Sequence, residues 1–396
     1  MKKNRLFIKT KNKVIESIQD RVLVWLFYFF RLWPIQRNKI VITTFKNRGY
    51  CDSPKYIVNE LLKRKEPYDF VWLCDNENPR DMPVGIRQVP YHSFRGIYEQ
   101  VTAHIWIDNR RKSRYVRKRE GQFYIQTWHG GIGLKNIEQA AESHLTKRYC
   151  QGAKNDSKMI DLFLSNSDFC TQIIRKDMWY RGAILQRGLP RSDVLLNGDR
   201  GRIERKVRDQ YKIADDVSIV LYAPTFRADM EASNYEFPFK RFLNELERQT
   251  RCKWIMLMHF HTNIFSRCEE NCFEERVLDT SNYEDVQELI IASQMLVSDY
   301  SSIIFDFALL NKPIIQYIFD LEDYLKDRAF NQSLEGLPFY KAHTPNEIVT
   351  LVRDIITNPQ YDTYTWMKNK YGLSESGRAA EYTADVIIKK MKGEYI

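Results

Sequence analysis

Two segments, one in each half of the chain, share a layout of a short apolar strand, a turn of small or polar residues and a predicted helix. The first spans 124–135 and has His129 in its turn. The second spans 295–315 and has Ser301 and Ser302 where the helix begins. Such a turn aims backbone N–H groups and a helix amino terminus at an anion such as phosphate. Two of them in one chain predict a phosphorylated substrate held between two domains.

Strands and helices are predicted to alternate along most of the chain. The expected strands lie at 39–45, 69–74, 104–108, 123–127 and 161–165, and then at 218–222, 253–258, 295–298 and 313–317. Their nearly continuous apolar character is typical of parallel sheets covered by helices on both faces. The stretches 190–193 and 199–208 break the pattern. We therefore predict an α/β protein with two Rossmann-like domains that face each other across a cleft.

Four parts follow from this division. A basic and apolar segment spans 1–37, an N-terminal acceptor domain 38–204 and a C-terminal substrate domain 205–375. The remainder, 376–396, contains a helical stretch that can pack back on the N-terminal domain.

The formal net charge of +10 suits an anionic partner: nucleic acid, a membrane surface or a phosphorylated substrate. A solvated surface explains each basic cluster equally well. The two densest clusters are Lys2, Lys3, Arg5, Lys9, Lys11 and Lys13, and Arg110, Arg111, Lys112, Arg114, Arg117, Lys118 and Arg119. The seven cysteines have no regular spacing, which predicts reduced thiols in a cytosolic setting.

Residues 22–30 are strongly apolar and are bracketed by Arg21 and Arg31. The stretch is shorter than the ~20 residues that a membrane-spanning helix needs. No small-residue cleavage site follows it, so a signal peptide is not expected. Basic residues followed by Trp and Phe favour an interfacial anchor on an anionic leaflet. The alternative is a helix that packs on its own domain.

Several further segments, in a fixed order, carry a family resemblance. They are Arg48-Gly-Tyr50 with Asp52-Ser-Pro-Lys-Tyr56, Thr127-Trp-His-Gly130 with Leu134-Lys135, Ser165-Asn-Ser-Asp168, Gly188-Leu-Pro-Arg-Ser-Asp193, Leu221-Tyr-Ala-Pro-Thr-Phe-Arg227, Ser298-Asp-Tyr-Ser-Ser302 and Asn311-Lys-Pro313. Together they resemble the CDP-glycerol glycerophosphotransferases, which build teichoic acids and related capsular polymers. The resemblance extends over nearly the whole chain.

The sequence departs from the family pattern at two places. Gly131-Ile-Gly133 replaces the common Thr-Pro, and Met258–Asn263 stands where the family often has Arg-Leu-His-Pro-Asn, with His261 at the position of the family histidine. The implied reaction type is unchanged by these departures. They leave open the acceptor and the choice between glycerol and another polyol.

The resemblance implies a GT-B-like transferase that moves a polyol phosphate from a CDP-activated donor to an acceptor hydroxyl and releases CMP. The implied donor is CDP-glycerol, with CDP-ribitol as the alternative, and the implied acceptor is lipid-linked or a glycan. The enzyme would act as a peripheral protein on an anionic membrane at the cytoplasmic face. We expect no nucleic acid partner and no cofactor.

The same reasoning assigns the site residues. His129 is the expected base, because its pKa lies near working pH, and His261 is a second catalytic candidate that can assist the leaving CMP. Arg227 is expected to clamp the pyrophosphate, and a surface ion pair is its alternative. The remaining expected substrate contacts are Gly130, Lys135, Asp299, Ser301, Ser302 and Arg328.

A zinc site is not expected, because the spacing of His259, His261, Cys268 and Cys272 does not match a common one. Three other functions remain as alternatives. A nucleotide-sugar glycosyltransferase would release a nucleoside diphosphate instead of CMP. A nucleic-acid-binding protein would use the basic residues at 110–119, although no recognition motif accompanies them. A membrane-bound scaffold with a dead site is disfavoured by the intact His129 and His261.

Overall fold

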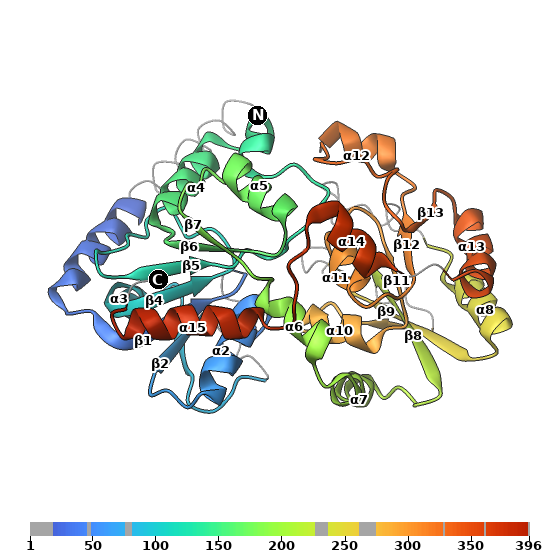
Figure 1. Cartoon of the computed structure of the whole chain (residues 1–396), viewed down its shortest axis with the longest axis horizontal. Helices are drawn as coiled ribbons and strands as arrows, with labels where there is room; N and C mark the ends of the chain where they lie inside the picture. Colours follow the sequence, from blue (N-terminus) through green and yellow to red (C-terminus); the bar gives the residue numbers. More distant parts are fainter. Residues whose placement is uncertain are drawn as a thin grey trace, which may run out of the picture.

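Two parallel β-sheets, each covered by helices on both faces, lie side by side in the molecule (Figure 1). A computed structural model describes residues 19–45, 49–75, 81–225, 237–260, 275–327, 329–359 and 362–394. The expected α/β class with two Rossmann-like halves is confirmed. The domain limits expected from the sequence remain proposals.

Over the described residues, the first sheet has seven strands in the order β3-β2-β1-β4-β5-β6-β7, and all neighbours are parallel. Its strands are β1 (Gln36–Thr43), β2 (Asp69–Cys74), β3 (Arg87–Pro90), β4 (Ala103–Asp108), β5 (Phe123–Gln126), β6 (Leu162–Ser165) and β7 (Ala183–Gln186).

The described part of the second sheet has six parallel strands in the order β10-β9-β8-β11-β12-β13. Its strands are β8 (Val217–Ala223), β9 (Lys253–Met258), β10 (Val277–Asp279), β11 (Met295–Ser298), β12 (Ile314–Tyr317) and β13 (Tyr340–Ala342).

In both sheets the strand order reverses between the first and the fourth strand. These switch points fall between β1 and β4 and between β8 and β11. Open α/β sheets bind ligands outside the carboxyl ends of their strands at such points. Of the two phosphate-type turns predicted from the sequence, the one after β11 lies at such a switch point, and the one after β5 lies one strand away, beside β4.

The described helices that cover the first sheet are α2 (Asp52–Lys63), α3 (Phe94–Thr102), α4 (Lys147–Met159), α5 (Asp168–Asp177), α6 (Pro190–Asn197), α15 (Ala379–Met391) and the 3₁₀ helix η2 (Glu138–His144). The described helices of the second half are α7 (Arg200–Tyr211), α8 (Phe239–Thr250), α10 (Val286–Ala292), α11 (Ile303–Ala308), α12 (Leu321–Asp327), α13 (Pro345–Thr357) and α14 (Thr363–Tyr371). The two stretches expected to break the pattern thus form helices α6 and α7. The last helix, α15, returns to the first sheet and lies against α2 and α6 (Figure 1).

Each sheet separates two apolar layers. Ile40 and Ile57 belong to the layer under α2 and α15, and Val41 and Ile97 belong to the layer under α3. In the second sheet, Leu221 faces α7, α10 and α11, whereas Val220 faces α8 and α13. Because neighbouring residues of a strand point to opposite faces, the continuous apolar strands fill both layers.

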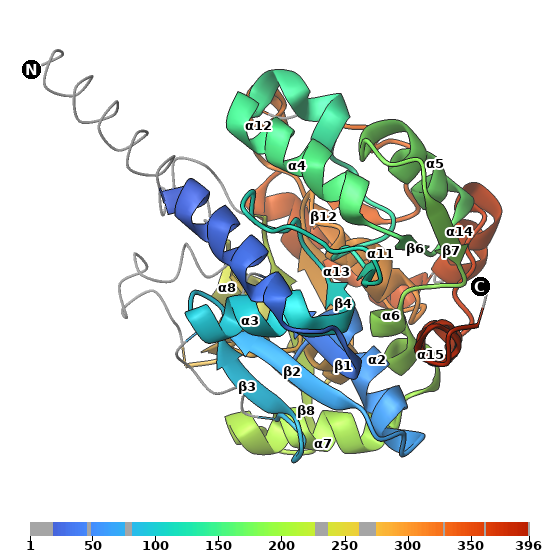
Figure 2. The same ribbon diagram turned by 90° about the vertical axis from the view of Figure 1, so that its left-hand side faces the viewer.

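The amino-terminal helix, described over residues 19–29 and followed by η1 (Phe30–Leu32), lies along the outer side of α3 (Figure 2). It is held on one side by Phe27, which is fully buried, and by Asp20, which pairs with Arg148 at 2.8 Å and with Arg114. Its other side leaves apolar residues in solvent: Val22, Trp25, Tyr28, Phe29, Leu32 and Trp33. The basic residues between Lys2 and Lys13 fall outside the described residues.

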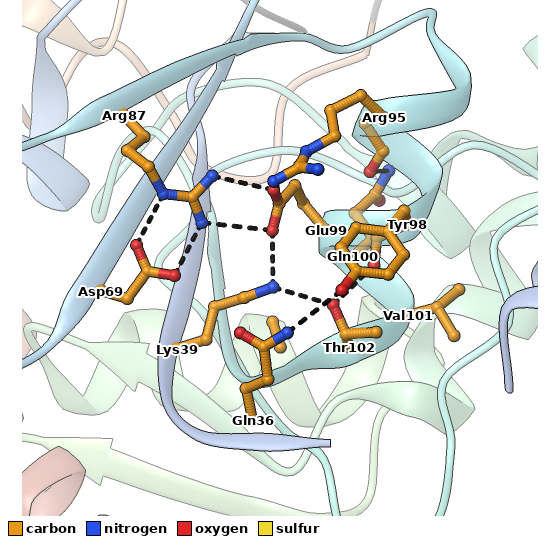
Figure 3. Close-up of polar contacts among 12 residues, drawn as sticks. Gln36, Lys39, Asp69, Arg87, Arg95, Tyr98, Glu99, Gln100, Val101 and Thr102 are labelled. Carbon is orange, nitrogen blue, oxygen red and sulfur yellow. Dashed lines mark hydrogen bonds and ion pairs between the residues drawn. The ribbon is translucent and has the colours of Figure 1, made fainter. Parts of the chain in front are cut away.

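A partly buried ionic cluster, centred on Lys39 and Glu99, fixes α3 to the amino-terminal parts of β1, β2 and β3 (Figure 3). Lys39 donates from Nζ to Glu99 Oε2 at 2.6 Å, and Arg87 binds Asp69 at 2.6 Å and Glu99 Oε1 at 2.8 Å. Burial opposes the charge of Glu99, but hydrogen bonds from Arg87 and Lys39 hold its pKa at about 2. Tyr98 of the same helix packs edge-on against Phe30. The cluster therefore also steadies the surface on which the amino-terminal segment lies.

Candidate active site

His129 lies just after the carboxyl end of β5, in a turn where Trp128 adopts a left-handed conformation with φ of 53°. Its Nδ1 lies 2.8 Å from the backbone carbonyl of Asn109, which follows β4. A carbonyl can only accept, so Nδ1 carries the proton and the neutral ring has its lone pair on Nε2. Burial lowers the pKa of His129 to about 4, more than the carboxylate of Asp52 raises it. The pKa thus lies below the near-neutral value expected from the sequence, and the imidazole is neutral at physiological pH and can accept a proton.

The second turn follows β11 and is tied to the end of β8. Both carboxylate oxygens of Asp299 accept from the backbone N–H of Thr225 at 2.9 Å, and Oδ1 also accepts from the Thr225 hydroxyl at 2.5 Å. Asp299 therefore joins the two strands that flank the switch point of the second sheet. Ser301 Oγ accepts from Ile303 N at 3.4 Å. Ser302 is the N-cap residue of α11, but its side chain makes no capping bond to that helix.

The two turns face each other. A Cβ atom placed on Gly130 would lie 3.3 Å from Ser302 Oγ, and one on Gly133 would lie 4.0 Å from Ser302 Cβ. A side chain at Gly130 would crowd the serine hydroxyl, which explains why glycine suits this position. The structure thus places Ser302 against Gly130, the neighbour of His129, and so brings together the two turns that the sequence predicts on two sides of one site.

A short antiparallel pairing between main-chain segments also joins the two halves of the molecule beside these turns. Asn136 N donates to Ala329 O at 2.9 Å, and Asn331 N donates to Leu134 O at 2.8 Å. Lys135 lies within this pairing, opposite Phe330, and its ammonium group lies 5.4 Å from the ring centroid of Tyr324. The turn that carries His129 is therefore bonded directly to the second half of the molecule.

Three predicted site residues, Arg227, His261 and Arg328, fall outside the described residues, so their roles stay predictions. Cys268 and Cys272 of the weighed zinc site fall outside as well. His259 is described, and its Nδ1 lies 2.8 Å from Thr280 O. Within the described ranges, no cluster of three or more His, Cys, Asp or Glu side chains is arranged to hold a metal ion.

The basic residues at 110–119 are largely engaged inside the protein. Arg111 is buried and pairs with Glu138 at 3.0 Å and with Asp156 at 3.2 Å. Lys112 is buried and lies 3.1 Å from Asp108, and Lys118 pairs with Asp161. The segment is therefore a part of the N-terminal half held by its own carboxylates, which removes the main argument for a nucleic-acid surface.

Arg191 is the most important residue that the sequence reasoning missed. It is 5% exposed, donates from Nη1 to the carbonyl oxygen of His129 at 2.9 Å, and pairs with Asp52 and with Asp306 of α11. The motif Gly188–Asp193 supported the family resemblance, but no role was assigned to its arginine. Asp52, from the motif 52–56, also accepts from Asn109 Nδ2 at 3.0 Å. In the sequence, the signal that could have pointed to Arg191 and Asp52 is that each belongs to a motif that resembles the family.

A second ionic contact joins the halves beside this arginine. Lys55 of α2 pairs with Asp285 at 2.7 Å and with Glu288 of α10 at 2.9 Å, and all three side chains are buried. Tyr56 donates to Asp285 at 2.8 Å. The motif 52–56 therefore serves the contact between the two halves as well as the site.

Comparison with known proteins gives a consistent picture. Residues 25–389 match the family model described as CDP-Glycerol:Poly(glycerophosphate) glycerophosphotransferase. The teichoic acid poly(glycerol phosphate) polymerase of Staphylococcus epidermidis is 28% identical over 372 residues, covering 90% of this chain and 51% of its own length. The corresponding polymerase of Bacillus subtilis is 26% identical over 404 residues, covering 98% of this chain and 54% of its own length. The chain thus spans about half the length of these two relatives.

The fold has a similar counterpart among solved structures. The wall teichoic acid polymerase TagF superposes with a TM-score of 0.82 at 26% sequence identity, and the match covers 98% of both chains. The teichoic acid poly(ribitol-phosphate) polymerase of Bacillus spizizenii is also similar, at 24% identity over 390 residues, covering 96% of this chain and 61% of its own length. The expected GT-B-like arrangement of two Rossmann-like domains is confirmed by the structural match.

Proposed function

We propose that this chain, which belongs to the CDP-Glycerol:Poly(glycerophosphate) glycerophosphotransferase family, transfers a polyol phosphate from a CDP-polyol to an acceptor hydroxyl and releases CMP. The product belongs to teichoic acid or capsular polymer synthesis. One observation carries the proposal: the turn that holds a neutral, half-buried histidine faces a serine turn of the other sheet, and both turns lie at the carboxyl ends of strands.

In the proposed reaction, the acceptor oxygen attacks the β-phosphorus of the CDP-polyol. A new P–O bond forms, the P–O bond to CMP breaks, and the acceptor proton passes to His129 Nε2. Phosphoryl chemistry of this kind depends on positioning and on stabilising charge more than on a covalent nucleophile. Ser301 and Ser302 would donate to phosphate oxygens, and Asp299 would hold their turn. Lys135, Arg227 and Arg328 would add positive charge, and His261 would assist the departing CMP.

Glycerol phosphate is the first polyol to test, and ribitol phosphate is the alternative. Three relatives are poly(glycerol phosphate) polymerases, and a TagF variant with asparagine in place of a histidine was soaked with CDPG. Ribitol-phosphate polymerases are similar to this chain as well. These likenesses support a CDP-polyol donor and a teichoic acid acceptor, presented on a lipid or a glycan.

The amino-terminal segment supports an additional proposal, peripheral attachment to an anionic membrane. None of the described helices is long and apolar enough to cross a bilayer. The helix instead exposes Trp25, Phe29 and Trp33 beside Leu32, which is 77% exposed. Aromatic side chains of this kind settle at the headgroup level of a membrane. Attachment at the cytoplasmic face would bring the site close to a lipid-linked acceptor.

The deciding experiment incubates the protein and a lipid-linked glycerol phosphate acceptor separately with CDP-glycerol, CDP-ribitol and a sugar nucleotide. We expect acceptor-dependent release of CMP from one CDP-polyol. Release of a nucleoside diphosphate from the sugar nucleotide would instead indicate a glycosyltransferase. Absence of CMP from both CDP-polyols would contradict the proposal.

A further inference from the structure

Arg191 occupies the point where the two halves of the molecule and the candidate base meet. Its Nη1 contacts the His129 carbonyl at 2.9 Å and Asp52 Oδ2 at 3.4 Å, both in the first half. From the second half, Asp306 pairs with Nη2, and the Gln287 amide lies 2.8 Å from Nε and accepts from it when its oxygen is assigned to face the guanidinium. One buried guanidinium therefore uses its donors on both halves at once.

The contacts in the first half form a closed ring around the base. His129 Nδ1 binds the carbonyl of Asn109, Asn109 Nδ2 donates to Asp52, and Asp52 and the His129 carbonyl both accept from Arg191. Displacement of Arg191 would therefore move two of the groups that set the orientation of the His129 ring.

The contacts in the second half lead directly to the serine turn. Asp306 lies on α11, whose N-cap residue is Ser302, and Ser302 faces Gly130 beside the base. Asp306 and Arg191 are both buried, so separating the two halves would break the buried ion pair between these two side chains. The contact therefore favours the arrangement in which the serine turn lies opposite the base.

We infer that Arg191 is a positioning residue: it couples the contact between the two halves to the placement of His129, so that the base is set correctly only when the serine turn is in place. This inference rests on the proposed function. The consequence would be that a CDP-polyol meets an oriented base only in the closed site. Water would then have less opportunity to act as the acceptor.

The test compares Arg191→Lys and Asp306→Asn with a control, Arg208→Lys. Lysine keeps a positive charge but cannot contact four groups in a planar fork. Arg208 is also buried and ion-paired, but its partners, Glu204, Ala214 and Val217, lie within its own half. We expect Arg191→Lys and Asp306→Asn to lower kcat about 100-fold, the scale of a small misplacement of reacting groups, with little change in the Kd for CDP-glycerol. The double variant should lose no more than the worse single variant, because both act through one contact.

A second readout does not depend on turnover. The ring signal of His129 in an NMR spectrum can be assigned by its absence from His129→Asn, and its titration reports the surroundings of the base. Among the described residues, the charged groups that act on His129 include Asp52, Arg110 and Arg191. We expect Asp306→Asn to shift this signal and its midpoint, although Asp306 belongs to the other half, and Arg208→Lys to leave both unchanged.

The outcomes separate the two proposals. If the wild-type protein releases no CMP from any CDP-polyol, the proposed function fails, and the NMR comparison still decides the coupling. If Asp306→Asn leaves kcat and the His129 signal unchanged, the coupling is wrong even when CMP is released. Asp306→Asn keeps the shape of the side chain and leaves Arg191 in place, so it decides the question even if Arg191→Lys does not fold.

Discussion

The protonation of a single imidazole determines what the candidate site can do. Since Nδ1 of His129 is committed to a carbonyl and burial keeps the ring neutral, Nε2 can receive a proton at physiological pH without first losing one. A solvent-exposed histidine with a pKa near 6.5 would be partly protonated there. The base should therefore remain competent well below neutral pH.

Replacement of His129 by alanine should reduce turnover while leaving donor binding nearly unchanged. A general base acts in the transition state, and its loss typically costs about 10²–10⁴-fold in rate. Paired Ser301→Ala and Ser302→Ala should instead weaken binding, because phosphate contacts exist before the reaction begins. Measurement of CMP release beside calorimetric titration of CDP-glycerol separates the two effects. Near-normal turnover of His129→Ala would transfer the role of base to another residue, with His261 the first to test.

The side chain of Glu375, in the connection between α14 and α15, is a second group whose pKa is strongly shifted. Its carboxyl oxygens accept from the backbone N–H of Leu189 at 3.1 and 3.3 Å. Burial raises the pKa of Glu375 to about 8, so the folded protein holds this proton at neutral pH. The stability that it contributes is complete below the unfolded pKa of about 4.3 and is lost as pH rises through about 8.

Glu375→Gln should remove this pH dependence. Relative to the variant, the unfolding free energy of the wild type should fall by about 1.4 kcal/mol per pH unit between about pH 5 and 8, because one extra proton is bound in the folded state. Urea unfolding at several pH values measures the difference. Glu322→Gln, at an exposed position, is the control and should follow the wild type. Parallel curves for wild type and Glu375→Gln would show that the carboxyl is already ionised.

At the scale of single helices, the amino-terminal helix packs on its own half of the molecule, and attachment to a membrane through its exposed side stays a prediction. Phe27 and its neighbours pack on the first domain, whereas the opposite side keeps aromatic residues in solvent. Trp25 and Phe29 stack on each other at 5.3 Å between ring centroids, which makes this exposed face continuous.

Substitution of Trp25, Phe29 and Trp33 by serine should lower flotation with anionic liposomes without unfolding the protein, because these side chains contribute little to the core. Full-length protein is compared with the triple variant on vesicles with and without anionic lipid. Leu325→Ser removes an exposed apolar residue from the second half and should float as the wild type does. Equal flotation of the triple variant and the wild type would assign membrane attachment to another surface, or to none.

The sequence predicted the central strands closely and missed the edges. Expected strands at 69–74, 253–258 and 295–298 coincide with β2, β9 and β11. The four strands that escaped prediction, β3, β7, β10 and β13, are the four edges of the two sheets. Edge strands are short and partly exposed, so they lack the apolar run that marks a buried strand.

The site was predictable where chemistry follows a strand end and unpredictable where it depends on contact between distant segments. His129 and Ser302 could be named because turns after parallel strands converge on one edge of a sheet. Arg191 could not be assigned a role, since Pro-Arg-Ser-Asp suggests only a break in the pattern. Its partners Asp52 and Asp306 are 139 and 115 residues away in the sequence.

Across the assembled chain, buried ion pairs hold the two halves together. Lys55→Met should lower the unfolding free energy by about 3 kcal/mol, because Asp285 and Glu288 would lose a buried cation. Lys63→Met is the matched control on the same helix: Lys63 is 75% exposed and lies 3.5 Å from Glu60, so its loss should cost well under about 1 kcal/mol. Chemical denaturation measures both, and equal losses would mean that the contact between the halves contributes little.

The backbone pairing of 134–136 with 329–331 has a practical consequence for protein engineering. Hydrogen bonds between main chains place no demand on side-chain identity, so halves taken from different family members can preserve this pairing. The pairs Arg191–Asp306 and Lys55–Asp285 do not share this freedom and must be transplanted as matched sets. The boundaries of a workable hybrid, for instance one that exchanges glycerol for ribitol donors, are therefore set by these pairs and not by the linker between the sheets.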